Sequence, residues 1–269
     1  MTEVRATSRR FASLARLFGD AGLERLWAAR VIVVGIGGVG SWAAEALARS
    51  GIGQIDLIDM DHIAESNINR QVHALSSSLG AAKVEAMRSR MADISPECVV
   101  RVHDCFAEPS NVAALLDATA NVIIDATDQV RAKAAMAGLS RDRGQHLIVC
   151  GAAGGRTDPM ALADDDIAFI KGDALIASLR AKMRRNYGFT REPGKAFGVR
   201  AIYSKENLGH HLGPKVGTGL VSTTGSEIVQ GGPGAPLACS GYGSMVTVTA
   251  AFGLAAASMS MKMILAGKR

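Results

Sequence analysis

The sequence predicts an α/β fold, a doubly wound and mostly parallel sheet of the Rossmann-like type. Residues 31–34 are four β-branched residues that end at a glycine cluster, 35–40. A run of strong helix formers follows directly at 41–48. Short apolar segments and helix-forming segments then alternate as far as residue 155, which is typical of parallel strands joined by crossover helices.

The remaining elements are placed in chain order by the same criteria. Strands are expected where apolar, mostly β-branched residues gather, at 31–34, 54–58, 99–102, 122–125 and 147–150. Helices are expected where apolar residues recur at helical spacing or helix formers gather, at 22–27, 41–48, 81–91, 112–116 and 131–139.

The character of the sequence changes after residue 155. Three aspartates stand at 164–166, a basic helix is expected at 173–187, and glycine-rich polar sequence continues to Pro236. We expect a single domain over residues 1–269, with a core at 1–155, an excursion at 156–237 and a C-terminal helix within 238–269.

The C-terminal segment 242–265 is apolar, rich in small residues and free of charge before Lys262. Its length would admit a membrane span. Small residues also permit close packing of a buried helix, which we favour. We therefore expect no stable membrane insertion, and membrane association through residues 242–265 is the less favoured alternative.

The composition is that of a soluble enzyme with one large core, since 269 residues include 48% hydrophobic residues and 30 glycines. A net charge of +5 favours a polyanionic partner, although the basic residues are widely spread. Residues 1–10 contain arginines with no apolar stretch behind them, so no secretory signal is expected and a cytoplasmic location follows. The cysteines Cys98, Cys105, Cys150 and Cys239 form no C-x-x-C pair, so we expect neither a disulfide framework nor zinc.

The glycine cluster predicts a turn that binds a nucleotide phosphate. Glycines allow the backbone to approach a phosphate, and the N-terminus of the following helix offers unpaired N–H groups to the anion. Asp59 ends strand 54–58, where a carboxylate can bind ribose hydroxyls. The turn residues are Gly35, Gly37, Gly38 and Gly40. On its own this pattern fits NAD as well as ATP.

A polar series after the second strand favours ATP over NAD, because such residues can converge on a triphosphate and its metal. Its members are Asp61, Asn67, Arg70, Gln71, Lys83 and Asp128. The local sequence leaves simpler roles open. Asp61 could cap a loop, and Lys83 could be solvated. Polar groups of the loop could be hydrogen-bonded by Asn67, Arg70 and Gln71. Asp125, which ends a strand, could bind a backbone N–H.

At these residues the chain resembles the ubiquitin-activating-enzyme-like adenylyltransferase superfamily, of ThiF and MoeB type. The resemblance runs from about Arg10 to Gly155 and resumes near Ala238. Within the superfamily it is similar to the tRNA threonylcarbamoyladenosine dehydratase branch, on segments 35–53, 58–61, 69–75, 154–159 and 239–243.

The resemblance implies a reaction and its partners. The threonine carboxylate of threonylcarbamoyladenosine in tRNA, beside the anticodon, attacks the α-phosphorus of ATP·Mg²⁺. The carbamoyl group then attacks the acyl-adenylate, which closes a ring and releases AMP. A homodimer is implied, and sulfur-transfer proteins are further partners that the resemblance allows.

The resemblance also assigns residues. Lys83 matches the phosphate lysine, Asp128 the catalytic, metal-binding aspartate, and Arg70 a catalytic phosphate contact. An N-terminal arginine reaches the γ-phosphate across the dimer, and the alignment favours Arg10 over Arg16; a solvated arginine is the alternative. Cys239 falls in a matched motif, but no histidine stands near it in the sequence and we expect no nucleophile there.

Two related activities are less favoured. Sulfur-carrier-activating relatives commonly hold zinc with two C-x-x-C pairs, and ubiquitin-type activators carry a thioester cysteine after the nucleotide core, whereas residues 184–237 contain no cysteine. Adenylation of the C-terminal glycine of a ubiquitin-like sulfur-carrier protein remains the second candidate. A non-enzymatic tRNA-binding module is the third.

The excursion carries a basic cluster with Tyr187 and Phe189 among its residues, a composition suited to phosphate contacts and base stacking. A solvated helix face is the alternative. The residues expected to bind tRNA are Arg180, Lys182, Arg184, Arg185 and Lys195.

Overall fold

The structure is a computed structural model that describes residues 9–206 and 243–267. Its strands are β1 (Arg30–Val34), β2 (Gln54–Ile58), β3 (Val99–His103), β4 (Val122–Asp125), β5 (His146–Cys150), β6 (Leu162–Asp166) and β7 (Arg200–Ser204). Its helices are α2 (Ala12–Ala28), α3 (Gly40–Arg49), α4 (Lys83–Ile94), α5 (Val112–Leu115), α6 (Val130–Arg143), α7 (Ala174–Asn186) and α8 (Val246–Ala266). Three short 3-10 turns are η1 (Glu65–Asn67), η2 (Ser76–Ser78) and η3 (Pro159–Ala161).

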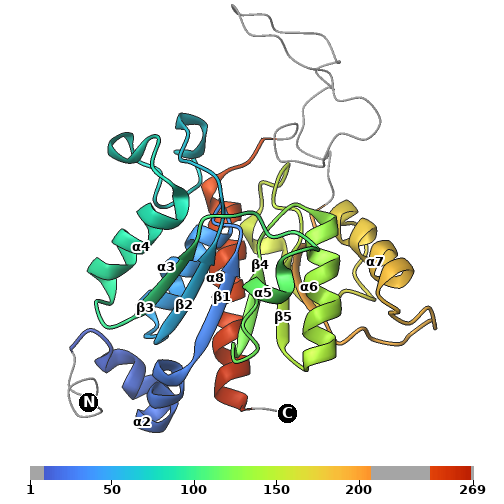
Figure 1. Cartoon of the computed structure of the whole chain (residues 1–269), viewed down its shortest axis with the longest axis horizontal. Coiled ribbons are helices and arrows are strands. Elements are labelled where there is room, and N and C mark those ends of the chain that lie inside the picture. Colours follow the sequence, from blue (N-terminus) through green and yellow to red (C-terminus); the bar gives the residue numbers. More distant parts are fainter. Residues whose placement is uncertain (1–8, 207–242, 268–269) are drawn as a thin grey trace, which may run out of the picture.

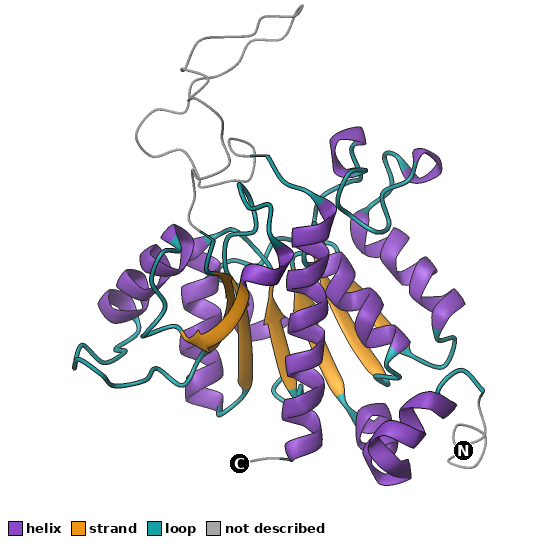
Figure 2. Ribbon diagram, turned by 180° about the vertical axis from the view of Figure 1, so that it is seen from behind, coloured by secondary structure: helices purple, strands orange, loops and turns teal. Residues whose placement is uncertain are grey.

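The strands form one seven-stranded sheet in the order β3-β2-β1-β4-β5-β7-β6. All neighbouring pairs are parallel except β6 and β7. Helices cover both faces, as Figure 1 and the reverse view in Figure 2 show. The predicted doubly wound, mostly parallel α/β fold is therefore confirmed.

The two faces of the sheet pack into separate apolar cores because successive strand residues point in opposite directions. Along β1, Val31 and Val33 face the core that includes α3, α4 and α8, whereas Ile32 and Val34 face the core that includes α5, α6 and α7. All five residues of β1 are buried, which explains its unbroken β-branched run.

The five strands predicted in the core are present, each with bounds within one residue of the expectation. Strands β6 and β7 lie in the excursion and were not predicted. Aspartate is depleted in strands, so the Asp164–Asp166 run gave no strand signal. Among the described strands β6 is an edge strand that pairs only with β7, so Asp164 and Asp165 suit a solvent-facing edge, whereas Asp166 is buried and accepts the Phe197 and Gly198 N–H groups. Helix α2 begins ten residues before the predicted 22–27 and is interrupted at Gly19, where φ is 71°.

Helix α8 is buried along one face and exposed along the other. Phe252 and Ala256 are fully buried, whereas Leu254 is 50% exposed. A Cβ on Gly253 would lie 2.4 Å from the Val39 carbonyl oxygen, so α8 and the start of α3 are in direct contact. By length and composition alone α8 is long and apolar enough to cross a membrane, as buried core helices also are, and one face of α8 is buried here.

Candidate active site

A cavity of about 890 Å³ opens at the carboxyl ends of the parallel strands. In a doubly wound sheet this edge is where ligands bind. The predicted residues that line it are Gly35, Gly37, Gly38, Asp59, Asp61, Arg70, Gln71, Lys83 and Asp128. Residues from across the first 130 positions therefore meet at one place, as expected from the sequence.

The turn after β1 depends on glycine at two positions. Gly35 has φ of 86°, and a Cβ there would lie 3.0 Å from the backbone of Ala126 and Thr127. A Cβ on Gly40 would lie 1.8 Å from the Gly35 carbonyl oxygen, so only glycine can pack against the turn at this position. Gly40 does not line the cavity. The turn can approach the cavity only as bare backbone.

Asp59 holds the turn to the end of β2. Its Oδ2 accepts the Ile36 N–H at 2.6 Å, and its Oδ1 accepts the Asp61 N–H at 2.9 Å. Burial raises the pKa of the Asp59 carboxyl, although the Asp61 and Ile36 N–H groups and the charge of Lys83 oppose that rise. Each carboxylate oxygen has further acceptor capacity for a ribose hydroxyl.

Lys83 is a buried cation at the start of α4. Its Nζ lies 2.7 Å from Asp61 Oδ2, and its side chain is 7% exposed. Both residues line the cavity, and Asp61 is half exposed whereas Lys83 is buried. The Lys83 ammonium group therefore lies at the cavity wall, where it is shielded from bulk solvent. This arrangement can neutralise a phosphate oxygen.

The segment between β2 and α4 is anchored over the turn. The Arg70 carbonyl accepts the Trp42 indole N–H at 2.9 Å, and Arg70 Nη1 donates to the Ser66 carbonyl and to Asn69 Oδ1. Gln71 is 5% exposed, lines the cavity, and its Oε1 has no hydrogen-bond partner within the described chain.

Asn67 has a local structural contact. It is buried outside the cavity lining, and its Oδ1 accepts the Ala64 N–H at 3.1 Å. The structure therefore gives Asn67 a turn-stabilising contact and does not bring it to the cavity with its predicted neighbours.

Asp128 follows β4, in a turn that is shaped by a buried charge pair, and the sequence interpretation missed this pair. Lys133 and Asp125 are both fully buried, and Lys133 Nζ lies 3.1 Å from Asp125 Oδ1. The same ammonium donates to the Asp125 and Cys150 carbonyls, so it joins the ends of β4 and β5. Asp125 Oδ1 also accepts the Thr127 N–H at 3.1 Å, which shapes the turn that carries Asp128.

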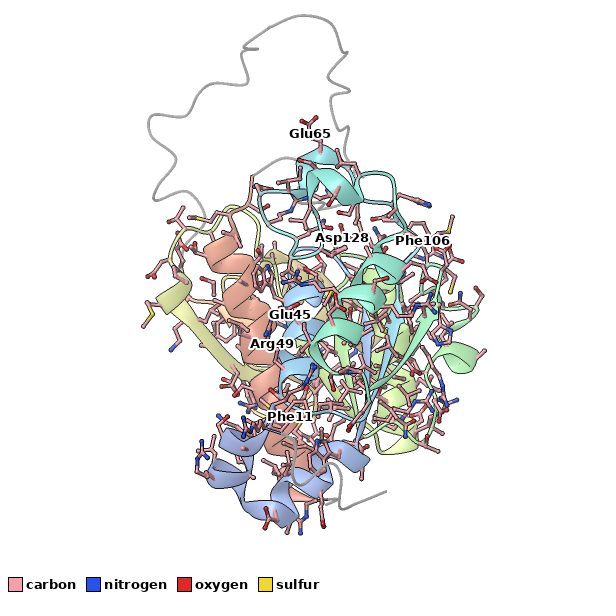
Figure 3. All side chains as sticks on the ribbon, turned by 90° about the vertical axis from the view of Figure 1, so that its left-hand side faces the viewer. Phe11, Glu45, Arg49, Glu65, Phe106 and Asp128 are labelled. Atoms are coloured by element: carbon pink, nitrogen blue, oxygen red, sulfur yellow. The ribbon has the colours of Figure 1, made fainter. Side chains whose placement is uncertain are left out.

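The cavity extends over two loops that the sequence interpretation did not include. The segment 105–110 follows β3 and lines one side, and Cys150 at the end of β5 and residues 151–154 after it line the other. In Figure 3, Phe106 and Asp128 lie in the same part of the molecule. Burial raises the pKa of the Cys105 thiol, and raises that of Cys150 to about 12, so both cavity cysteines are neutral thiols at pH 7.

Arg10 does not line this cavity in its own chain. Its guanidinium donates to the Asp93 and Ile94 carbonyls at the end of α4. Figure 3 shows Phe11, its neighbour, at the opposite end of the molecule from Asp128. Arg16 lies on α2 and is exposed.

The predicted tRNA-binding residues differ in their contacts. Arg180 donates to the Ile167 and Ile170 carbonyls, and Arg184 donates to the Thr190 carbonyl and stacks over Phe197. Lys195 pairs with Glu192 at an exposed site. These contacts fix Arg180 and Arg184 within the excursion. Cys239 and the part of the excursion from 207 to 237 lie outside the described residues.

Together, the glycine turn, the aspartate after β2 and the lysine–aspartate series at one sheet edge define an α/β nucleotide-binding protein of the adenylating type, and the chain belongs to the ThiF family, whose model matches residues 8–268. The superfamily expected from the motifs is confirmed.

The chain is similar over nearly its whole length to particular members. It is 41% identical over 261 residues to the tRNA threonylcarbamoyladenosine dehydratase of Escherichia coli (strain K12), covering 97% of this chain and 95% of the relative. It is 36% identical to the Haemophilus influenzae protein of the same name over all of this chain and 98% of the relative. The crystal structure of the E. coli enzyme TcdA in complex with ATP superimposes with a TM-score of 0.83 at 39% identity, covering 96% of this chain and 94% of that one. The E. coli molybdopterin-synthase adenylyltransferase matches only 44% of this chain, at 33% identity.

Proposed function

We propose that this protein catalyses the ATP-dependent dehydration of threonylcarbamoyladenosine in tRNA to its cyclic form. The observation that carries the proposal is the cavity, which gathers the glycine turn, Asp59, Lys83 and Asp128 at one sheet edge. Full-length similarity to a dehydratase of that name, which has been crystallised with ATP, supports it.

The chemistry needs no nucleophile from the enzyme. The threonine carboxylate displaces pyrophosphate from the α-phosphorus, and the substrate's own carbamoyl group then displaces AMP from the activated carbonyl. An internal nucleophile has a high effective concentration, so a covalent enzyme intermediate is unnecessary. Neutral thiols at Cys105 and Cys150 agree with this scheme.

Each cavity residue has a proposed role that follows from its position. The glycine turn holds phosphates, Asp59 holds the ribose, and Lys83 and Arg70 neutralise phosphate oxygens. The described residues contain no cluster of three His, Cys, Asp or Glu side chains that could hold a metal alone. Asp128 together with phosphate oxygens is a suitable donor set for Mg²⁺, which would neutralise the triphosphate.

A homodimer is the assembly we propose, located in the cytoplasm with its tRNA substrate. Arg10 is distant from its own cavity, so any contact with a γ-phosphate has to come from a partner protomer. The exposed side of α8, with Leu254 half exposed, offers an apolar surface for a second copy.

The function is tested by incubating the purified protein with ATP, Mg²⁺ and tRNA that bears threonylcarbamoyladenosine. We expect the modified nucleoside to lose the mass of one water, with one AMP formed per nucleoside. An unchanged nucleoside mass would reject the proposal. AMP formation only when a ubiquitin-like carrier protein is added would instead support the sulfur-carrier alternative, and tRNA binding without ATP turnover would support a binding module.

The contacts in the excursion sharpen the prediction for tRNA. The side chains of Lys182 and Arg185 on α7 have no hydrogen bond or ion pair within the described residues, unlike that of Arg184. Replacing both by alanine is expected to weaken tRNA binding and reduce its salt dependence by about one log–log unit per lost phosphate contact, with ATP affinity unchanged. Binding titrations at several salt concentrations measure this. An unaltered salt slope would make α7 an ordinary solvated face.

A further inference from the structure

The cavity has two sides that meet at Asp128. One side is formed by Asp59, Asp61, Lys83 and the loop 105–110, at the ends of β2 and β3. The other is formed by Cys150 at the end of β5, residues 151–154 after it, Arg131 at the start of α6, and Ala174 and Leu175 at the start of α7. If the nucleotide occupies the first side, as the proposed function requires, the carboxylate to be adenylated approaches over the ends of β4 and β5.

The second side has one cationic side chain among its described lining residues, Arg131. The other cations of the described cavity lining, Lys83 and Arg70, are assigned above to the phosphates, and they also contact Asp61 and the Ser66–Asn69 segment respectively. Arg131 is exposed at the cavity, and its guanidinium makes no hydrogen bond or ion pair with any described residue. A guanidinium can bind a carboxylate through two parallel hydrogen bonds.

The backbone around Arg131 adds to the positive potential. Arg131 stands in the first turn of α6, where the first intrahelical bond runs from the Lys133 N–H to the Gln129 carbonyl. The N–H groups of Val130, Arg131 and Ala132 therefore have no partner within the helix, and Ala132 also lines the cavity. The buried Lys133–Asp125 pair fixes this turn to the ends of β4 and β5.

We infer that Arg131 binds the substrate carboxylate and holds it beside the α-phosphate. This inference rests on the proposed function. The carboxylate oxygen forms a bond to the α-phosphorus, the bond from phosphorus to the β-bridging oxygen breaks, and pyrophosphate leaves with the electron pair. Arg131 offsets the repulsion between the carboxylate and the triphosphate without taking or giving a proton.

The test compares two ligands and four proteins. The ligands are an anticodon stem-loop RNA with threonylcarbamoyladenosine and the same RNA with the threonine carboxylate methylated to an ester. Binding is measured with α,β-methylene-ATP present, in which the scissile bond is blocked. The proteins are wild type, Arg131→Ala, Arg131→Lys and the control Arg88→Ala, which removes an exposed arginine of α4 outside the cavity.

Wild type and Arg88→Ala are expected to bind the acid about 10- to 100-fold more tightly than the ester, the range for a hydrogen bond to a charged group. Arg131→Ala should bind both alike, and Arg131→Lys should retain part of the preference. An equal preference in wild type and Arg131→Ala, or none in wild type, overturns the inference. Failure of wild type to dehydrate the nucleoside with ATP overturns the proposed function instead, and this is read in a separate assay.

Discussion

Asp128→Asn is expected to reduce dehydration and AMP formation together by on the order of 10²- to 10³-fold, the range for removing one preorganised electrostatic group. The substitution keeps the shape of the side chain and removes the negative charge that we assign to Mg²⁺ binding. Asp128 Oδ1 contacts only the neighbouring Gln129 side chain among the described residues, so the fold should not change. Release of AMP and pyrophosphate in single-turnover reactions measures the effect.

The control is Asp142→Asn, which removes an exposed carboxylate near the other end of α6. It should leave AMP formation unchanged, and both variants should bind tRNA like wild type. Normal AMP release from Asp128→Asn would remove Asp128 from the mechanism.

The inactive chain also tests Arg10, because mixing Asp128→Asn with Arg10→Ala restores activity only if the arginine acts across a dimer.

Lys133→Met is expected to reduce the free energy of unfolding by about 3–5 kcal/mol, the usual loss when one partner of a buried charge pair is removed. The substitution leaves Asp125 buried without its cation and frees the Cys150 carbonyl, since Lys133 Nζ contacts both. Urea unfolding followed by circular dichroism measures the loss. The matched control is Lys195→Met, whose exposed ion pair with Glu192 should contribute less than about 1 kcal/mol.

A loss below about 1 kcal/mol for Lys133→Met would mean that the pair contributes little net stability. The double variant Lys133→Met/Asp125→Asn is expected to recover part of the loss, because it no longer buries an unpaired carboxylate. If the double variant recovers stability while its AMP formation stays below that of wild type, the Lys133–Asp125 pair also positions the turn that carries Asp128.

The core strands could be predicted because β-branched runs such as Val31–Val34 are buried on both sides and leave a strong local signal. Most of the cavity residues could be predicted for a related reason: parallel strands end at one edge, so polar residues just beyond each strand meet there. Strand β6 could not be predicted, since its pairing with β7 is a tertiary property that overrides the low strand propensity of aspartate. Lys133 gave no signal because a lysine in a helix is usually solvated, and only the fold shows that it is fully buried. Asn67 has a turn contact that local chemistry had already allowed.

The contact between α8 and the start of α3 couples the positions of these two helices. At Gly253 helix meets helix without an intervening side chain, and Thr249, one turn earlier on α8, lines the cavity. A shift of α8 therefore cannot be absorbed by a rotamer change and must displace the helix that begins at the phosphate turn. Thermodynamic reciprocity then applies: whatever packs on the outer side of α8 and alters nucleotide affinity must have its own affinity altered by the same factor when nucleotide binds.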